Sequence, residues 1–123
     1  MEPKTLKIDD VEYVRKDSVT SGRGAEKVDG LECVLVRTYS AGVHFGYLKK
    51  HSGTEVTLIN SRRVYYWEGA MTLSQLSVDG SSKIKSCKIT VPVNFIILTQ
   101  AIEILPMTDR AQKNLYGADE WKM

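Results

Sequence analysis

Alternating apolar and polar positions divide the chain into short strand-like segments separated by turn residues. In TLKIDDVEYVRKD, apolar residues alternate around Asp9-Asp10, which predicts a tight leading hairpin over residues 6–15. Residues 16–30 are rich in serine, glycine and charge and keep no period, so we expect a loop there. The next segment, LECVLVRTY, is apolar on both alternating faces, as is typical of a central strand covered from two sides.

Two short turns follow this central strand, and each contains a glycine. They lie at SAG (40–42) and HSGT (51–54), and they separate three strand-like segments within residues 31–67. Strands joined by such short turns pair antiparallel, so we expect an antiparallel meander over 31–67.

The pattern changes after the third of these strands. Thr72 and Gln75 match the capping box, in which each side chain satisfies a backbone N–H at a helix start. This predicts a short helix over 72–79 that ends near Gly80. Its position immediately after an arginine-rich strand end matters for the candidate chemistry considered below.

The remaining segments complete the predicted fold. Residues 88–105 are β-branched and apolar, with Pro92 marking an edge or a bulge, and we expect two or three strands there. Thr108 or Asp109 can cap a second helix over 108–116, after which Trp121 could dock on the domain or on another subunit. The sum is a single α+β domain spanning 1–123. It is mainly antiparallel, with about six or seven strands curled into a small barrel or sandwich and two short helices.

Composition and charge narrow the classes of function. The chain has 123 residues, of which 42% are apolar and 26% charged, as in an ordinary globular domain. The net charge of +2 is too small for general nucleic-acid binding, which grows with the number of phosphates that a protein neutralises. Any basic site must therefore be local.

Two further features of the sequence indicate the cellular compartment. No run approaches the ~20 apolar residues of a membrane helix, and the opening MEPKTLKIDD lacks the apolar centre of a signal peptide. Cys33 and Cys87 have no paired spacing and sit in apolar segments, so we expect buried thiols in a reducing compartment. These observations favour a cytoplasmic protein.

Enzyme chemistry finds little support in the sequence. His44 and His51 are the side chains whose ordinary pKa is near neutrality, yet neither lies in a catalytic motif. The chain also lacks a nucleophile elbow, a phosphate-binding glycine loop and a metal-ligand spacing, so we expect no metal site and no cofactor. A triad assembled from distant residues, such as Ser40 with His44, stays open.

The most distinctive stretch is NSRRVYYWEGAMTLSQL, residues 60–76, where two arginines adjoin three aromatic residues. On a regular strand Arg62 shares a face with Tyr66, whereas Arg63 shares the other face with Trp67. One molecule could therefore meet both arginines only if the strand is bulged or if two subunits contribute different faces.

This combination of residues suits a nucleotide. Guanidinium groups bind phosphate oxygens in pairs and aromatic rings stack on bases, so we expect Arg62 and Arg63 on phosphate and Tyr66 and Trp67 on the base. The helix start at Thr72 offers backbone N–H groups. Two residues complete the predicted ligand-binding set: Arg37 and His44. The alternative is that the arginines are solvated charges and that the aromatic residues pack in a core or an interface.

Three segments of the chain resemble a family of small bacteriophage and prophage proteins catalogued as a domain of unknown function. They are VRTYSAGVHFGYL, LINSRRVYYWEGAMTLSQLSVDG and VPVNFIILTQAIEILP, spread between Val34 and Thr108. The family's pattern of asparagine, arginine, aromatic and Trp-x-Gly-Ala-x-Thr-Leu falls here on Asn60, Arg62 or Arg63, Tyr66, Trp67, Gly69, Ala70, Thr72 and Leu73. The family usually has an acidic residue near the position of Asn94.

The resemblance implies a phage origin, and hence the cytoplasm of an infected bacterium. Phage accessory proteins of this size include sponges, which sequester nucleotide immune signals, commonly between identical subunits. Our first hypothesis is accordingly a non-enzymatic, homo-oligomeric protein that binds a small anionic nucleotide. The alternatives are a structural or host-protein-binding phage protein and, third, a nucleotide-cleaving enzyme with His44 as base.

Overall fold

The structure is a computed structural model that describes residues 30–123. The predicted hairpin at 6–15 and all but the last residue of the predicted loop at 16–30 lie outside the described residues. The described elements, in chain order, are β1 (Cys33–Thr38), β2 (Val43–Ser52), β3 (Glu55–Tyr66), α2 (Leu73–Asp79), a 3-10 turn η1 (Ile84–Ser86), β4 (Lys88–Ile89), β5 (Val93–Leu98), β6 (Ala101–Pro106) and α3 (Asp109–Tyr116).

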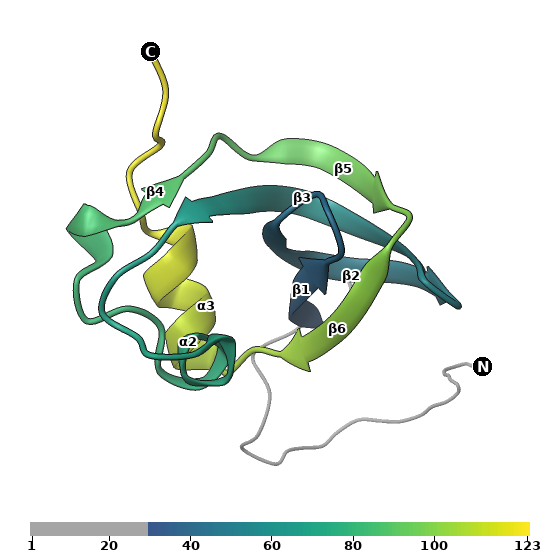
Figure 1. The fold of residues 1–123 in the computed structure, drawn as a ribbon, viewed down its shortest axis with the longest axis horizontal. Coiled ribbons are helices and arrows are strands. Elements are labelled where there is room, and N and C mark those ends of the chain that lie inside the picture. The colour runs from purple at the N-terminus through teal and green to yellow at the C-terminus, as the bar shows by residue number, and fades with distance from the viewer. Residues whose placement is uncertain (1–29) are drawn as a thin grey trace.

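The fold is α+β and mainly antiparallel, as the sequence predicts. β1, β2 and β3 form a meander, and β1 lies between β2 and β6 within the sheet. On its far edge β3 pairs with β5 through its first half and with β4 through its second half. The sheet therefore has six strands, and the two helices α2 and α3 lie side by side beyond it (Figure 1).

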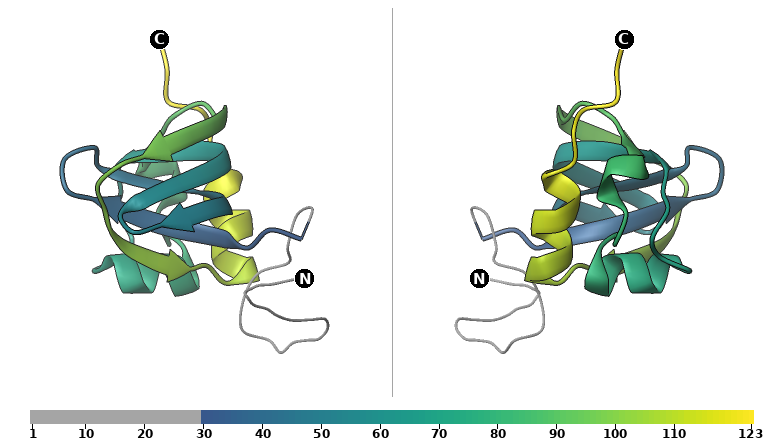
Figure 2. Two further views of the ribbon diagram at one scale, coloured as in Figure 1. Left: turned by 90° about the vertical axis from the view of Figure 1, so that its right-hand side faces the viewer. Right: turned by 90° about the vertical axis from the view of Figure 1, so that its left-hand side faces the viewer.

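The sheet curls strongly but is not closed into a barrel, so the barrel, one of the two predicted arrangements, is not formed. β5 and β6 follow one another through a two-residue turn, yet they pair with opposite sides of the meander. The turn is held by the loops beside it, because Ala101 N donates to Thr54 O at 3.0 Å and Tyr39 N donates to Gln100 O at 2.9 Å. The curl is visible in the two side views (Figure 2).

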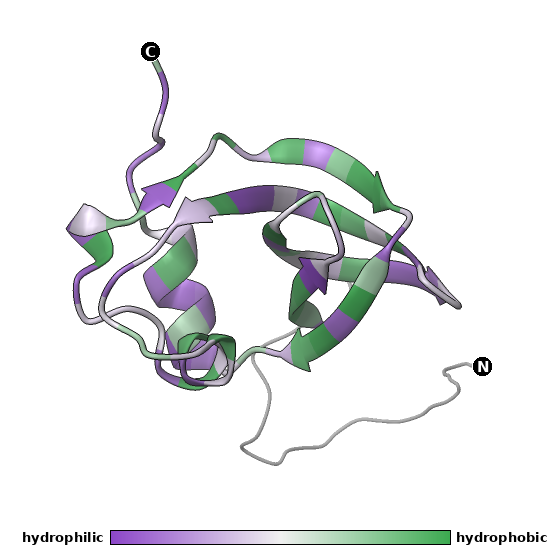
Figure 3. Cartoon of the chain, in the orientation of Figure 1, coloured by the Kyte–Doolittle hydropathy of each residue, from purple (hydrophilic) through white to green (hydrophobic). Residues whose placement is uncertain are grey.

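Alternation along β1 supplies two separate hydrophobic cores. Cys33 and Leu35 point toward the helices and pack with Phe45 and Leu115, whereas Val34 and Val36 point into the curl of the sheet. We call these the helix-side core and the curl-side core. In Figure 3, β5 and β6, which cover the curl-side core, are mostly green with a purple band within each.

The curl-side core is smaller and lies under β5 and β6. Its buried members are Val34, Val36, Val56, Leu58, Leu98 and Ala101. Because both faces of the meander are covered, the central strand needs apolar residues at nearly every position, which explains the pattern of LECVLVRTY.

The helix caps follow the sequence signals. The Thr72 hydroxyl accepts the Gln75 N–H at 3.1 Å, and the Gln75 side chain accepts the Met71 N–H at 2.8 Å. In α3 the Thr108 hydroxyl accepts the Ala111 N–H at 3.1 Å. Each cap thus satisfies N–H groups that the first turn of a helix leaves without a partner.

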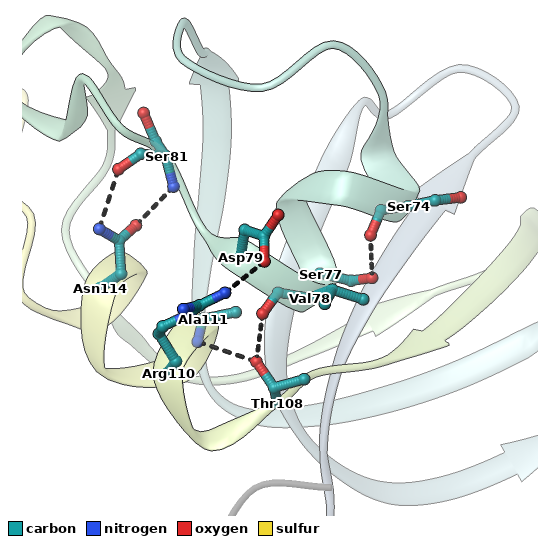
Figure 4. Close-up of polar contacts among 9 residues, drawn as sticks. All are labelled: Ser74, Ser77, Val78, Asp79, Ser81, Thr108, Arg110, Ala111 and Asn114. Carbon is teal, nitrogen blue, oxygen red and sulfur yellow. Dashed lines mark hydrogen bonds and ion pairs between the residues drawn. The ribbon is translucent and has the colours of Figure 1, made fainter. Parts of the chain in front are cut away.

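Polar contacts fasten the two helices to each other. Thr108 Oγ1 also donates to Val78 O, and Arg110 forms an ion pair with Asp79 (Figure 4). Asn114 accepts from Ser81 N at 2.8 Å and donates to Ser81 O at 3.0 Å. The end of α2 and the face of α3 therefore form one unit.

Both cysteines are free thiols. Cys33 is buried in the helix-side core with its Sγ 3.6 Å from Met107 Sδ, and burial raises its pKa to about 12. Cys87 is half-buried next to the Ser81 hydroxyl, so the expectation of burial holds fully for Cys33 alone.

Candidate functional site

A bulge in β3 determines what its arginines face. The register between β2 and β3 shifts opposite Gly46, where Asn60 adopts a positive φ of 52°. Asparagine tolerates this left-handed conformation better than most residues. Glycine suits the position opposite it, because a Cβ on Gly46 would lie tightly against the backbone of β3, 3.0 Å from Ile59 O and 3.1 Å from Ser61 Cα.

The bulge exchanges the two faces of the strand. Before it, Val56 and Leu58 point into the curl-side core, whereas after it Val64 points into the helix-side core. Arg62 shares the helix side with Val64, and Arg63 faces the other way. The two arginines are therefore separated by the strand itself, and the bulge does not bring them together.

Arg62 is a structural residue. Its side chain is only 3% exposed, and its five N–H donors are all directed at backbone carbonyls. Nε donates to Thr90 O at 2.7 Å; Nη1 donates to Leu115 O and Tyr116 O at 3.3 and 3.1 Å; Nη2 donates to Ile89 O and Asp119 O at 3.3 and 3.5 Å. Two of these carbonyls end α3, where the helix dipole favours a cation.

The predicted phosphate contact by Arg62 therefore does not fit the geometry. A guanidinium whose donors are all engaged inside the fold has none left for a ligand. Burial lowers the pKa of Arg62, while the charge of Glu120 acts in the opposite direction. An arginine so placed stays protonated, and it joins β3 to β4, to α3 and to the C-terminal tail.

Arg63 lies on the open face and lines a pocket. It is the cross-strand neighbour of His44, which in turn pairs with Val36 of the curl-side core. The pocket has a volume of about 270 Å³, and its lining residues are His44, Ser61, Arg63, Thr90, Val91, Val93 and Ile96. His44 and Ser61 are its buried lining residues, whereas Arg63, Val91 and Val93 are exposed at its opening.

The pocket contains a polar atom without a partner. Ser61 is 1% exposed, and its hydroxyl has no hydrogen-bond partner among residues 30–123. Leaving a buried hydroxyl unpaired costs roughly 1–3 kcal/mol, so such groups commonly mark a place for a water or a ligand. At the rim, Thr90 Oγ1 accepts the backbone N–H of Arg63 at 3.1 Å.

His44 presents a neutral imidazole to this pocket. Its Nε2 lies 2.9 Å from Ala41 O, and because a carbonyl only accepts, Nε2 carries the hydrogen and Nδ1 keeps a lone pair. Burial lowers the pKa of His44, the Ala41 hydrogen bond raises it, and the charge of Arg63 lowers it further. His44 is thus an acceptor at neutral pH.

An exposed aromatic cluster joins the end of β3 to β4 and to the C-terminal tail. Tyr65 follows Arg63 by two residues and stacks on Trp121, with ring centroids 4.7 Å apart and planes 20° from parallel. The Lys88 ammonium lies 5.4 Å from the Trp121 ring, and Trp121 N donates to Ile89 O at 2.8 Å. We call Tyr65, Trp121 and Lys88 the aromatic platform.

The other predicted site residues lie apart from this pocket or serve the fold. The Tyr66 hydroxyl donates to Glu68 at 2.6 Å, and Trp67 packs against the helix-side core with its indole N–H on Ala70 O at 3.3 Å. Thr72 caps α2. Arg37 forms an exposed ion pair with Glu103, 3.7 Å apart, on β1 and β6. Of the seven predicted residues, His44 and Arg63 are the two that meet.

Some site residues were missed by sequence reasoning. Ser61 lies between Asn60 and Arg62 and has a short neutral side chain, so only the bulge identifies it as a pocket residue. Thr90 carries no local signal, since it reaches the site through the pairing of β3 with β4. Trp121 was recognised as an anchor, and its partner Tyr65 was passed over in favour of Tyr66 and Trp67.

Residues 31–115 match a family described as a domain of unknown function, DUF6948. The chain belongs to this family. The match covers every described strand and both helices except the last residue of α3. No curated protein matches this DUF6948 chain. No solved structure matches it either.

Neither a metal-binding group nor a membrane-spanning helix is found in the described part of this DUF6948 chain. Among residues 30–123, no group of three His, Cys, Asp or Glu side chains is placed to hold a metal ion. None of the described helices has the length and apolar character that crossing a bilayer would demand.

Proposed function

We propose that this DUF6948 protein binds a small anionic nucleotide in the pocket of His44, Ser61, Arg63 and Thr90 and sequesters it. The observation that carries the proposal is the unpartnered, buried Ser61 hydroxyl beside an exposed arginine and an acceptor histidine. A charge, a donor and an acceptor are thus gathered at one opening beside the apolar side chains of Val91, Val93 and Ile96, and such a mixture is usual for a ligand site.

The pocket fits the phosphate-bearing part of such a ligand. At about 270 Å³ it lies just below the range of roughly 300–1,000 Å³ for small-molecule sites, so a whole nucleotide would extend beyond it. Arg63 can bind two phosphate oxygens at once, and the Ser61 hydroxyl can donate to a third acceptor. The base then lies outside, where the aromatic platform offers an exposed ring face.

Sequestration without turnover is supported by the surroundings of His44. A backbone carbonyl orients this ring, and no carboxylate among residues 30–123 is hydrogen-bonded to it, so the third member of a Ser-His-Asp triad is not in place there. We propose further that the protein is homo-oligomeric and acts against nucleotide immune signals in the cytoplasm of a phage-infected bacterium. The phage context rests on the sequence resemblance, because the family itself is described only as a domain of unknown function.

The test is calorimetric titration of the full chain with a panel of cyclic and ADP-ribose-type nucleotides. We expect Arg63→Ala to weaken binding by about 10-fold or more, since a hydrogen bond to a charged group contributes roughly 1.5–3 kcal/mol. Arg37→Ala is the matched control, because it removes the same charge from another exposed strand position. Equal losses from both variants would indicate general electrostatics and contradict the site.

A second measurement separates binding from cleavage. The bound nucleotide should be recovered intact by chromatography after long incubation with excess protein. A product peak that disappears in His44→Gln would instead support the enzyme hypothesis. If no nucleotide of the panel binds at high micromolar concentration, the proposal fails.

A structural or partner-binding role is the second candidate function. The observation that favours it is an exposed apolar row on β5, formed by Val93, Phe95 and Ile97. Val93 also lines the pocket, whereas Phe95 and Ile97 do not, so substitutions of Phe95 and Ile97 can be assayed separately from the ligand site.

A further inference from the structure

The outer side of β5 has the features of an unprotected sheet edge. Within residues 30–123, β5 pairs with β3 along one edge, and no pairing is seen along its other edge. Natural sheets usually protect such edges with lysines, prolines, bulges or a covering segment, because a free edge is a template for another strand. Pro92 precedes β5, but the strand itself, VNFIIL, contains neither charge nor proline.

Three alternate residues of this strand are apolar and exposed. Val93, Phe95 and Ile97 are 43%, 59% and 51% exposed, respectively. Alternate residues of a strand lie in one row, so these side chains form a continuous apolar row beside the free edge. Figure 1 shows β5 as the outermost strand above β3.

We infer that this edge is where two copies of the chain pair, β5 against β5 and antiparallel, so that one sheet runs through both copies. This specifies the subunit contact of the proposed homo-oligomer and requires no nucleotide. A failed nucleotide titration therefore leaves it standing, and its own failure leaves the ligand site standing.

A second copy suits this edge better than an unrelated protein for two reasons. The first is charge: the whole stretch from Thr90 to Ile102 contains no charged residue, so two identical edges approach without repulsion. The second is symmetry. Antiparallel pairing centred on Phe95 places Phe95 opposite its own copy and Val93 opposite Ile97 of the partner subunit, so every exposed apolar residue meets another.

The strength expected of this contact is modest. One strand pair with a single apolar row buries less area than the standard interface of about 1,600 Å², so the dimer should be concentration-dependent. Sedimentation velocity between about 5 and 500 µM should show a monomer converting to a dimer. Phe95→Lys should remove the dimer, because it places two ammonium groups opposite each other on the symmetry axis.

Tyr39→Lys is the matched control for this variant. It changes another exposed aromatic residue, which lies in the β1–β2 turn and not on β5, and it should leave the dimer unchanged. Circular dichroism of both variants should show the same folded spectrum as the unmodified chain, since both positions are exposed.

The register itself can be tested by disulfide formation. Directly opposed residues of an antiparallel pair have Cα atoms about 4.5–5.5 Å apart, within the range that a disulfide spans. Phe95→Cys should therefore form a disulfide dimer with itself under mild oxidation. Val93→Cys should link to Ile97→Cys when the two variants are mixed, and faster than either links to itself.

Two outcomes would overturn the inference. One is a chain that stays monomeric at the highest concentration. The other is a dimer whose formation Phe95→Lys does not weaken, or in which Phe95→Cys links no faster than Tyr39→Cys. A monomeric chain whose β5 row is buried by a different protein would assign this edge to that partner and contradict self-pairing.

Discussion

Two adjacent arginines of β3 have opposite roles although nothing in their own side chains distinguishes them. Arg62 directs its five donors at backbone carbonyls inside the fold, whereas Arg63 is exposed at the rim of the pocket. The alternation of a strand accounts for their separation, and the sequence predicted it. The bulge at Asn60 determines which of the two arginines turns inward. The residue types alone did not indicate this bulge.

A pair of conservative substitutions tests this difference at the residue scale. Arg62→Lys should lower the free energy of unfolding by roughly 2–4 kcal/mol, because an ammonium with three donors cannot replace a guanidinium fork among buried carbonyls. Arg63→Lys should change it by less than about 0.5 kcal/mol, as for most exposed positions. Urea unfolding followed by circular dichroism measures both, and equal losses would contradict the structural role of Arg62.

At the scale of elements, features that depend on neighbouring residues could be predicted from the sequence, whereas pairings between distant strands could not. The meander, the Thr72 and Thr108 caps and the two-sided β1 all follow from patterns within a few residues. The pairing of β5 and β6 with opposite sides of the meander joins residues about 30–70 positions apart, for which the sequence carries no local signal. For this reason the sequence predicted a small barrel or a sandwich and did not predict an open, curled sheet.

The candidate site was partly predictable for the same reason. His44 and Arg63 were named because their chemistry is visible in their residue types. Their meeting with Ser61 and Thr90 depends on the bulge and on the short strand β4, neither of which the pattern of apolar residues reveals. Trp67 and Tyr66 were favoured for stacking because they stand next to the arginines in the sequence, yet each is engaged within the fold.

The bulge of β3 makes a prediction at this scale. Asn60→Val should lower the free energy of unfolding by about 1–2 kcal/mol, because a β-branched residue is strained at positive φ. Asn60→Gly should be neutral or slightly stabilising, since glycine adopts this conformation freely. Asn94→Val, on the exposed part of β5, is the control and should have little effect. A tolerated Asn60→Val would show that the bulge does not require residue 60 to keep its left-handed conformation.

At the scale of the whole molecule, the C-terminal tail is part of the fold. The Asp119 carbonyl oxygen accepts a hydrogen bond from Arg62, Glu120 forms an isolated β-bridge with Ile89, and the Trp121 ring stacks on Tyr65. The tail therefore connects the buried arginine, the short strand β4 and the aromatic platform. It lies beyond residue 115, where the match to the family ends.

Truncation tests this connection. A chain ending at Gly117 should lose roughly 1–3 kcal/mol of unfolding free energy, because it lacks the Asp119 carbonyl, the Trp121 hydrogen bond and the stacked ring pair. Removal of Lys122 and Met123 alone should change stability by less than about 0.5 kcal/mol. Thermal unfolding of the two truncated chains decides the matter, and similar melting curves would exclude a stabilising role for the tail.

The buried guanidinium has one further consequence for how such a protein can vary. All five groups that receive its hydrogens are main-chain oxygens, which persist whatever side chains stand at those five places. Substitutions at these five positions should therefore be tolerated, whereas substitution of Arg62 itself should not. An arginine at this position is then a requirement of the architecture, whatever the protein binds.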